Sequence, residues 1–183
     1  MLDGSTNASI RPRNPSPPFD SSARLRLRSD GVYFITLCTV DRSSRFGRVI
    51  DAAVEFNAVG RIVDKAWRWL ATNYDYVEFG PYVVMPNHLH GIIKFAPDEG
   101  GSRTAPTKPA RKPLGRLIGA FKTLSTKHVN ELLQTSGDVL WQRNYWEHIV
   151  RDDDSLTKIV DYIVNNPKTW ESDKLFITDG RTL

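Results

Sequence analysis

Two histidines, His88 and His90, stand one residue apart in the stretch VVMPNHLHGIIKF, residues 83–95. The apolar residues around them predict a β-strand, in which alternate side chains point to the same face. Both histidines therefore share one face, whereas Leu89 and Ile93 point to the other, which we expect to be core. Two neutral imidazoles at this spacing can bind one divalent cation. We expect the face that carries the histidines to lie outside the core. The alternative to a metal site is an exposed pair of histidines that binds nothing.

A tyrosine and a carboxamide could complete such a site. In DSLTKIVDYIVNNP, residues 154–167, apolar residues recur at helical spacing. Tyr162 lies well off that apolar stripe, and Asn166 follows one turn later on the same flank. Each has an ordinary alternative: a boundary tyrosine with its hydroxyl in water, and a turn residue before Pro167. The hypothesis of a catalytic role for Tyr162 and Asn166 rests on their occurrence together with the histidine pair.

Periodic patterns predict the elements that must position these residues. Their order is β-α-β-β-α-β-α, and the third strand follows the second through a tight turn. This order predicts an α+β fold, an antiparallel sheet with helices packed on one face. The predicted strands are 31–40, 76–85 with a bend or bulge at Gly80-Pro81, 88–95, and a short one within 139–151; the predicted helices are 50–71, 114–134, and one from Asp152–Asp154 to Asn166.

The chain has 183 residues, which suits one domain with modest extensions. Its net charge of +4 favours a polyanionic partner without requiring one. We predict a disordered basic arm at 1–28, a single domain at 29–175 interrupted by a flexible loop at 96–112, and a tail at 176–183. The positive excess is concentrated in the arm and the loop.

Composition also excludes several classes of protein. Cys38 is the only cysteine, so an internal disulfide and a cysteine-rich zinc site are impossible. No apolar run approaches the roughly 20 residues of a membrane span, and the N-terminus has no apolar core of a secretory signal. We expect a cytoplasmic protein without a membrane partner.

Three motifs, taken together, carry a resemblance to a known family. MPNHLHGII, WQRNYWEHIVRD and DYIVNNP, in this order and spacing, resemble the single-tyrosine HUH transposases (U being a hydrophobic residue), closest to the REP-associated tyrosine transposases. The resemblance covers roughly residues 29–170 and implies a ferredoxin-like fold. It implies that His88 and His90 are metal ligands, that Tyr162 is the nucleophile, and that Asn166 is the third ligand. His148 matches a recurrent family position without an assignable role.

The resemblance implies a DNA transposase that cleaves and rejoins single-stranded DNA bearing a hairpin. Tyr162 would attack a phosphodiester and form a 5′-phosphotyrosine, assisted by a divalent metal, Mg²⁺ or Mn²⁺. Such a protein would associate with the nucleoid when bound to DNA, and it could act as a homodimer.

We expect DNA contacts from the helix at 114–134 and from the aromatic segment that follows it. Arg116, Lys122 and Lys127 give that helix a phosphate-binding composition, although an ordinary solvated face is about equally plausible. Arg143 interleaves with aromatic residues that could stack on unpaired bases. Those aromatic residues, which could instead be core, are Trp141, Tyr145 and Trp146.

Two other functions remain open. The first is a non-catalytic nucleic-acid-binding module on a ferredoxin-like fold, which would bind without cleaving. The second is a zinc hydrolase with histidine ligands. Against the hydrolase, the sequence has no HExxH pattern and no evident acidic ligand beside the histidines.

Overall fold

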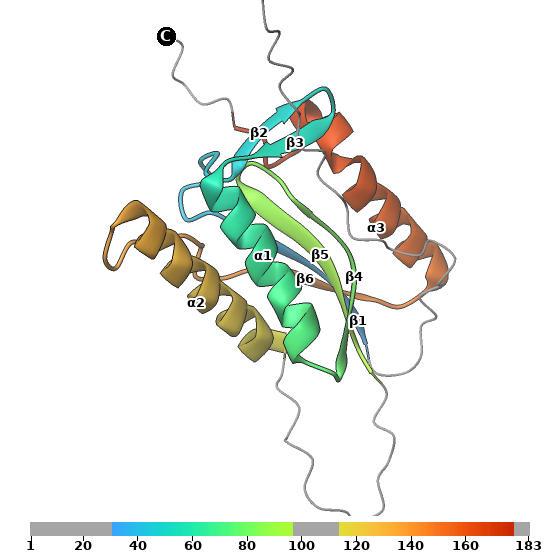
Figure 1. Cartoon of the computed structure of the whole chain (residues 1–183). Coiled ribbons are helices and arrows are strands. Elements are labelled where there is room, and N and C mark those ends of the chain that lie inside the picture. Colours follow the sequence, from blue (N-terminus) through green and yellow to red (C-terminus); the bar gives the residue numbers. More distant parts are fainter. Residues whose placement is uncertain (1–30, 97–113, 178–183) are drawn as a thin grey trace, which may run out of the picture.

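The structure is a computed structural model that describes residues 31–96 and 114–177. The predicted arm at 1–28, and most of the predicted loop and tail, lie outside these ranges. Within them, no helix is long and apolar enough to cross a membrane. The elements are β1 (Val32–Cys38), β2 (Gly47–Ile50), β3 (Ala53–Phe56), α1 (Ala58–Asn73), β4 (Val77–Val84), β5 (His88–Phe95), α2 (Leu114–Leu133), β6 (Trp146–Val150), α3 (Asp153–Asn165) and the 3-10 helix η1 (Asn166–Ser172) (Figure 1).

A four-stranded antiparallel sheet carries the fold, with the strand order β4-β5-β1-β6. Apart from the small β2–β3 hairpin and α3, the chain order is β-α-β-β-α-β, so the arrangement is ferredoxin-like. The predicted α+β class is confirmed. The irregularity predicted at Gly80-Pro81 is present as a shift in the pairing of β4 with β5, between Phe79 and Tyr82.

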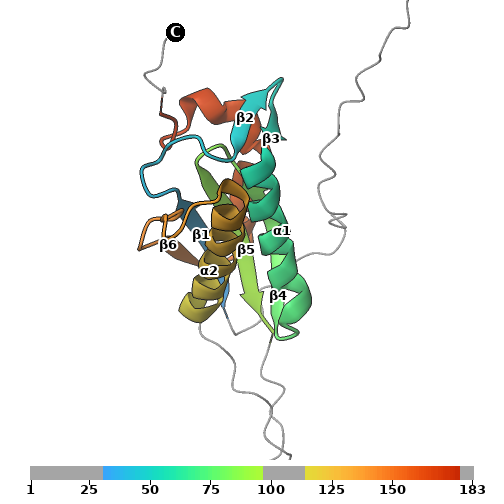
Figure 2. The same ribbon diagram turned by 60° about the vertical axis from the view of Figure 1, so that its left-hand side comes forward.

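The helices cover both faces of the sheet. α1 and α2 lie side by side on one face, as predicted (Figures 1 and 2), whereas α3 lies across the other (Figure 1). The prediction of helices on one face therefore does not extend to α3. The reason is visible in β5, where Ile92 and Ile93 point to opposite faces and neither is exposed. A central strand that is apolar on both faces needs cover on both.

A β-hairpin occupies the beginning of the helix predicted at 50–71. Asp51 and Ala52 join β2 to β3 with φ of 50° and 58°, which suits a two-residue hairpin turn and excludes a helix. The side chain of Asn57 then accepts a backbone N–H bond of 2.9 Å and caps α1. The predicted start of this helix was wrong because Val54, at helical spacing from the later apolar residues, belongs to β3.

α3 is capped at its first turn and is followed directly by η1. Asp152 caps the helix by accepting a 2.6 Å bond from the Ser155 N–H, as the predicted role of the acidic run requires. After α3 the chain turns through η1, which begins with Asn166. Trp170 in η1 is buried, and its ring lies 5.8 Å from that of His88. This packing brings the end of η1 back against β5.

Candidate active site

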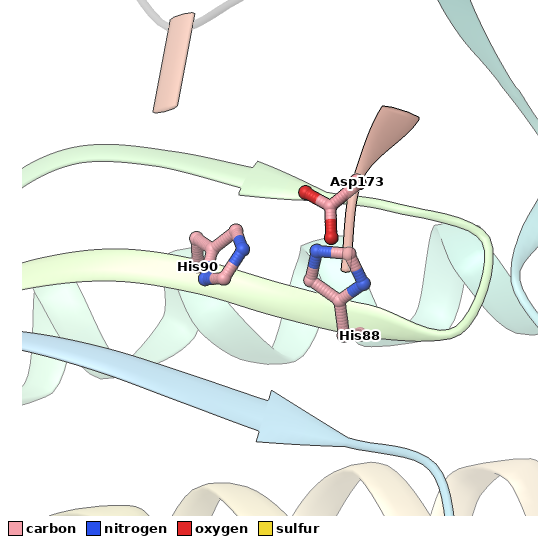
Figure 3. A group of neighbouring side chains, drawn as sticks. All are labelled: His88, His90 and Asp173. Carbon is pink, nitrogen blue, oxygen red and sulfur yellow. The ribbon is translucent and has the colours of Figure 1, made fainter. Parts of the chain in front are cut away.

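His88 and His90 lie next to each other on β5, with ring centroids 4.4 Å apart (Figure 3). The expectation that the core does not use this face was wrong, because α3 and η1 cover it and the residues are 0% and 3% exposed. Burial, and for His88 also the neighbouring His90, lowers the pKa of His88 to about 3 and that of His90 to about 4. Both imidazoles are therefore neutral at pH 7, the form that binds metal.

Tyr162 lies beside the histidine pair. Its hydroxyl is 3.1 Å from Nε2 of His90 and 3.0 Å from Oδ2 of Asp173. The residue is 41% exposed and lines a cleft, so it can be approached from outside. Partial burial, and then the charge of Asp173, raise the pKa of Tyr162. The phenol is therefore protonated at neutral pH and needs a group that accepts its proton before it can attack.

Asp173 completes a cluster that sequence reasoning missed. One ligand atom from each of His88, His90 and Asp173 lies within 4.8 Å of the others, and Figure 3 shows the carboxylate facing the imidazoles. The pKa of Asp173 is lowered from its ordinary value. Burial acts to raise this pKa, but the hydrogen bonds from the Leu175 N–H and the Asn166 amide lower it by more. The argument that no acidic residue stands beside the histidines was therefore wrong. Asp173 follows η1, outside the motifs that drew attention to the site.

Asn166 contacts this cluster through its carboxamide. The side chain is fully buried, and its Nδ2 donates to Asp173 Oδ2 at 2.7 Å. Among the described residues, Oδ1 of Asn166 and Nε2 of His88 are buried atoms without a hydrogen-bond partner. An unsatisfied buried polar atom costs about 1–3 kcal/mol. A divalent cation bound to these atoms would remove that cost, so the donor set fits a metal.

The cluster opens into a cleft of about 790 Å³. Tyr162, His90 and Asp173 line one part of it, together with Thr36. Other lining residues could hold a nucleic acid by charge or by stacking. These are the exposed Arg42 and Lys174, which the sequence did not single out, and the aromatic Phe34, Tyr145 and Trp146.

The residues predicted to contact DNA are spread over two sides of the molecule. Arg116 and Lys127 are exposed on α2, which lies across the sheet from Tyr162. Nζ of Lys122 donates to three backbone carbonyls, at 2.8 to 3.2 Å, in the segment 142–144. Arg143 is exposed in that segment, between two residues that line the cleft. Of the four, Lys122 contacts this segment and Arg143 belongs to it, and two residues of the segment, Gln142 and Asn144, line the cleft.

The aromatic residues also divide into two groups. Trp141 is 3% exposed and packs on Phe121, so it belongs to the core. Trp146 is 53% exposed at the rim of the cleft. Its ring is nearly parallel to that of His148, at an angle of 7° and a centroid distance of 5.8 Å. Trp146, and not Trp141, is available for stacking.

Comparison with known proteins tests the resemblance that the motifs carry. No family model matches the chain. An uncharacterised protein of Haemophilus influenzae is 34% identical over 157 residues, which cover 82% of this chain and 87% of that protein. A second Haemophilus influenzae protein, described as a candidate REP-associated tyrosine transposase, is 27% identical over 150 residues, covering 80% and 76%. The predicted resemblance to the REP-associated tyrosine transposases is therefore confirmed.

A solved REP-associated tyrosine transposase, bound to a REP hairpin, has the same fold. Its TM-score is 0.55 at 19% identity, and the match covers 81% of this chain and 76% of that one. The four residues that the resemblance selects, His88, His90, Tyr162 and Asn166, all lie around one point in this chain. The structure adds Asp173 to them.

Proposed function

We propose that the protein is a metal-dependent transposase that cleaves and rejoins single-stranded DNA beside a hairpin, with Tyr162 as the nucleophile. The observation that carries the proposal is the Tyr162 hydroxyl, 3.1 Å from Nε2 of His90 at the wall of an open cleft. A nucleophile, two neutral metal ligands and room for a strand meet there.

The reaction is a transesterification at phosphorus. The Tyr162 oxygen attacks the phosphate in line, and the bond from phosphorus to the 3′-oxygen breaks. The 3′-oxygen leaves as a hydroxyl after taking up a proton, and a 5′-phosphotyrosine remains. The reverse attack by a 3′-hydroxyl rejoins the strand, so no external energy source is required.

His88 and His90 would hold the metal, with oxygen from Asn166 and from Asp173. This mixture of imidazole and oxygen ligands suits Mn²⁺ or Mg²⁺, and the imidazoles favour Mn²⁺. When bound, such an ion offsets negative charge that develops on the phosphate oxygens and orients the phosphate. Asp173 accepts the hydrogen bond of Tyr162, so its carboxylate is also the nearest group that could receive the phenolic proton.

The preference for single-stranded DNA rests on the shape and composition of the cleft. An unpaired strand can bend until one phosphate faces Tyr162, and its free bases can stack on Trp146. Arg42, Lys174 and Arg143 would neutralise neighbouring phosphates. The relative bound to a REP hairpin supports a hairpin as the folded part of the substrate.

One rival gains from the structure. Two histidines and a carboxylate also form the ligand set of many zinc hydrolases. Asp173 therefore makes the hydrolase a stronger alternative than it was from the sequence alone. The similarity to a REP-associated tyrosine transposase and the position of Tyr162 favour the transposase. Zinc retained through dialysis, with hydrolysis that leaves no protein–DNA adduct, would support the hydrolase.

Incubation with hairpin-bearing single-stranded DNA and Mn²⁺ tests the proposal directly. We expect a covalent protein–DNA adduct that survives denaturing electrophoresis and is absent for Tyr162→Phe. Tyr145→Phe is the matched control, because Tyr145 also lines the cleft. An adduct formed by Tyr162→Phe would refute this nucleophile, and binding without any cleavage would favour the non-catalytic module.

A further inference from the structure

The carboxamide of Asn87 is engaged by three separate parts of the chain. Its Nδ2 lies 2.8 Å from the carbonyl oxygen of Arg42 and 2.8 Å from that of Leu175. Its Oδ1 lies 2.8 Å from Nδ1 of His88. Asn87 is only 1% exposed, so its carboxamide makes these hydrogen bonds with the protein and not with solvent.

This arrangement determines the proton position on His88. Carbonyl oxygens only accept hydrogen bonds, so the atom of Asn87 that faces two of them must be the NH₂ group. The atom facing His88 is then the carbonyl oxygen, and Nδ1 of His88 must carry the proton. A neutral imidazole protonated at Nδ1 has its lone pair on Nε2. That is the buried atom of His88 without a partner, so the lone pair is free for an ion.

His90 has a hydroxyl group, and not a carboxamide, beside each ring nitrogen. Its Nδ1 lies 2.8 Å from the hydroxyl oxygen of Thr36. A hydroxyl can donate or accept, so Thr36 is compatible with either tautomer. The two histidines therefore differ. Asn87 requires the proton of His88 on Nδ1, whereas the Tyr162 hydroxyl, which donates to Asp173, accepts from Nε2 of His90 when that nitrogen carries the proton.

Asn87 also holds the segment that carries the acidic residue of the cluster. The Leu175 carbonyl accepts from Asn87, and the Leu175 N–H donates to Oδ1 of Asp173 at 2.7 Å. One side chain is thus linked to His88 directly and to Asp173 through a single residue. These two groups come from β5 and from the region after η1, 85 positions apart in sequence.

We propose that Asn87 is a positioning residue of the metal site: it holds His88 as the Nδ1–H tautomer, with Nε2 directed at the ion, and fixes the segment of Asp173. This inference rests on the metal site of the proposed function. Partners of metal-bound histidines act in this way, and their removal typically costs 10–100-fold in metal affinity. If Asn87 only stabilised the turn between β4 and β5, its loss would lower stability without changing the imidazole.

The first test needs no variant. In the full-length metal-free protein, the ¹⁵N shifts and long-range ¹H–¹⁵N couplings of His88 report which ring nitrogen carries the proton. We expect the Nδ1–H form to dominate. A dominant Nε2–H form of His88 would overturn the proposal, whatever the protein binds.

The second test compares Asn87→Ser with Asn130→Ser. Asn130 is a matched control because its carboxamide also clamps a turn, by donating to the Asp138 carbonyl at 3.1 Å, at the end of α2. Mn²⁺ affinity is measured by electron paramagnetic resonance, and the His88 tautomer by NMR. We expect Asn87→Ser to mix the tautomers and weaken Mn²⁺ binding by about 10–100-fold, and Asn130→Ser to change neither.

Unchanged Mn²⁺ affinity and an unchanged tautomer in folded Asn87→Ser would overturn the proposal. If that variant does not fold, the tautomer in the wild-type protein decides. A wild-type protein that binds no Mn²⁺ but shows the Nδ1–H form of His88 would instead count against the metal in the proposed function. The two failures are therefore distinguishable.

Discussion

The hydroxyl of Tyr162 donates a 3.0 Å hydrogen bond to Oδ2 of Asp173, and the same oxygen accepts a 2.7 Å bond from Nδ2 of Asn166. One carboxylate oxygen thus joins the proposed nucleophile to a proposed ligand. Because a carboxylate binds metal far better than a neutral amide does, Asp173 should contribute to the affinity of the site as well as to its geometry.

Asp173→Asn should therefore weaken Mn²⁺ binding by about tenfold or more. The substitution keeps the shape of the side chain and removes its charge. Glu171→Gln is the control, since it removes the same charge from an exposed position two residues earlier. Titration with Mn²⁺ under electron paramagnetic resonance measures both variants. Equal affinities for Asp173→Asn and the wild type would reduce Asp173 to a structural role.

Removing a histidine should affect stability as well as metal binding. His88 is fully buried against Trp170, so His88→Ala leaves a cavity and should cost about 2 kcal/mol or more. His128→Ala, at an exposed position on α2, should stay within about 0.5 kcal/mol of the wild type. Urea unfolding gives both values.

The same unfolding curves detect the metal. Mn²⁺ at 100 times its dissociation constant should stabilise the wild-type protein by about 2.7 kcal/mol. His88→Ala should gain none of this stabilisation, and His128→Ala should gain all of it. A full gain in His88→Ala would mean that the ion binds elsewhere.

The sequence predicted the sheet well because strand alternation is a local property. β5 begins at His88 as predicted, and its pairing with β4 follows from the short turn at Pro86-Asn87. The hairpin of β2 and β3 was missed for a related reason. Val54 fits helical and strand spacing equally well, and the turn at Asp51 and Ala52 has no glycine to reveal its positive φ.

The site was only partly predictable because its last member arrives through tertiary packing. His88, His90, Tyr162 and Asn166 stand in recognisable motifs. Asp173 stands in none, and it reaches the histidines because the buried Trp170 anchors η1 beneath them. The burial of the histidines was missed for the same reason, since nothing in β5 says that α3 will cross that face.

Trp146 should bind an unpaired base next to the cleaved phosphate. Its exposed ring stands edge-on to Phe34 at 5.5 Å, and Phe34 in turn lies 6.2 Å from the Tyr162 ring. Trp146→Ala should weaken binding of single-stranded DNA by about 1–3 kcal/mol and leave duplex binding unchanged. Trp69→Ala is the control, because Trp69 is also exposed but lies on α1, across the sheet. Equal losses for single strand and duplex would argue against stacking.

Lys122 should support DNA binding without touching a phosphate. Its ammonium is directed at the carbonyls of Gln142, Arg143 and Asn144, and it lies 5.5 Å from the centre of the Tyr145 ring. These contacts hold the segment that forms one wall of the cleft. An ammonium committed in this way releases no counterion when DNA binds.

The salt dependence of DNA binding distinguishes a lysine that supports the cleft wall from one that contacts a phosphate. A lysine that neutralises one phosphate of a single strand adds about 0.7 to the slope of log K against log salt. Lys122→Met should therefore weaken binding of hairpin-bearing single strands at every salt concentration and leave that slope unchanged. Lys127→Met is the matched comparison on the same helix, because the Lys127 side chain is 69% exposed and its Nζ lies 3.9 Å from Oε1 of Glu131. If Lys127 contacts a phosphate, the slope measured for Lys127→Met is lower than that of the wild type. A slope lowered by about 0.7 in Lys122→Met would show that its ammonium leaves the carbonyls for a phosphate, as the composition of α2 first suggested.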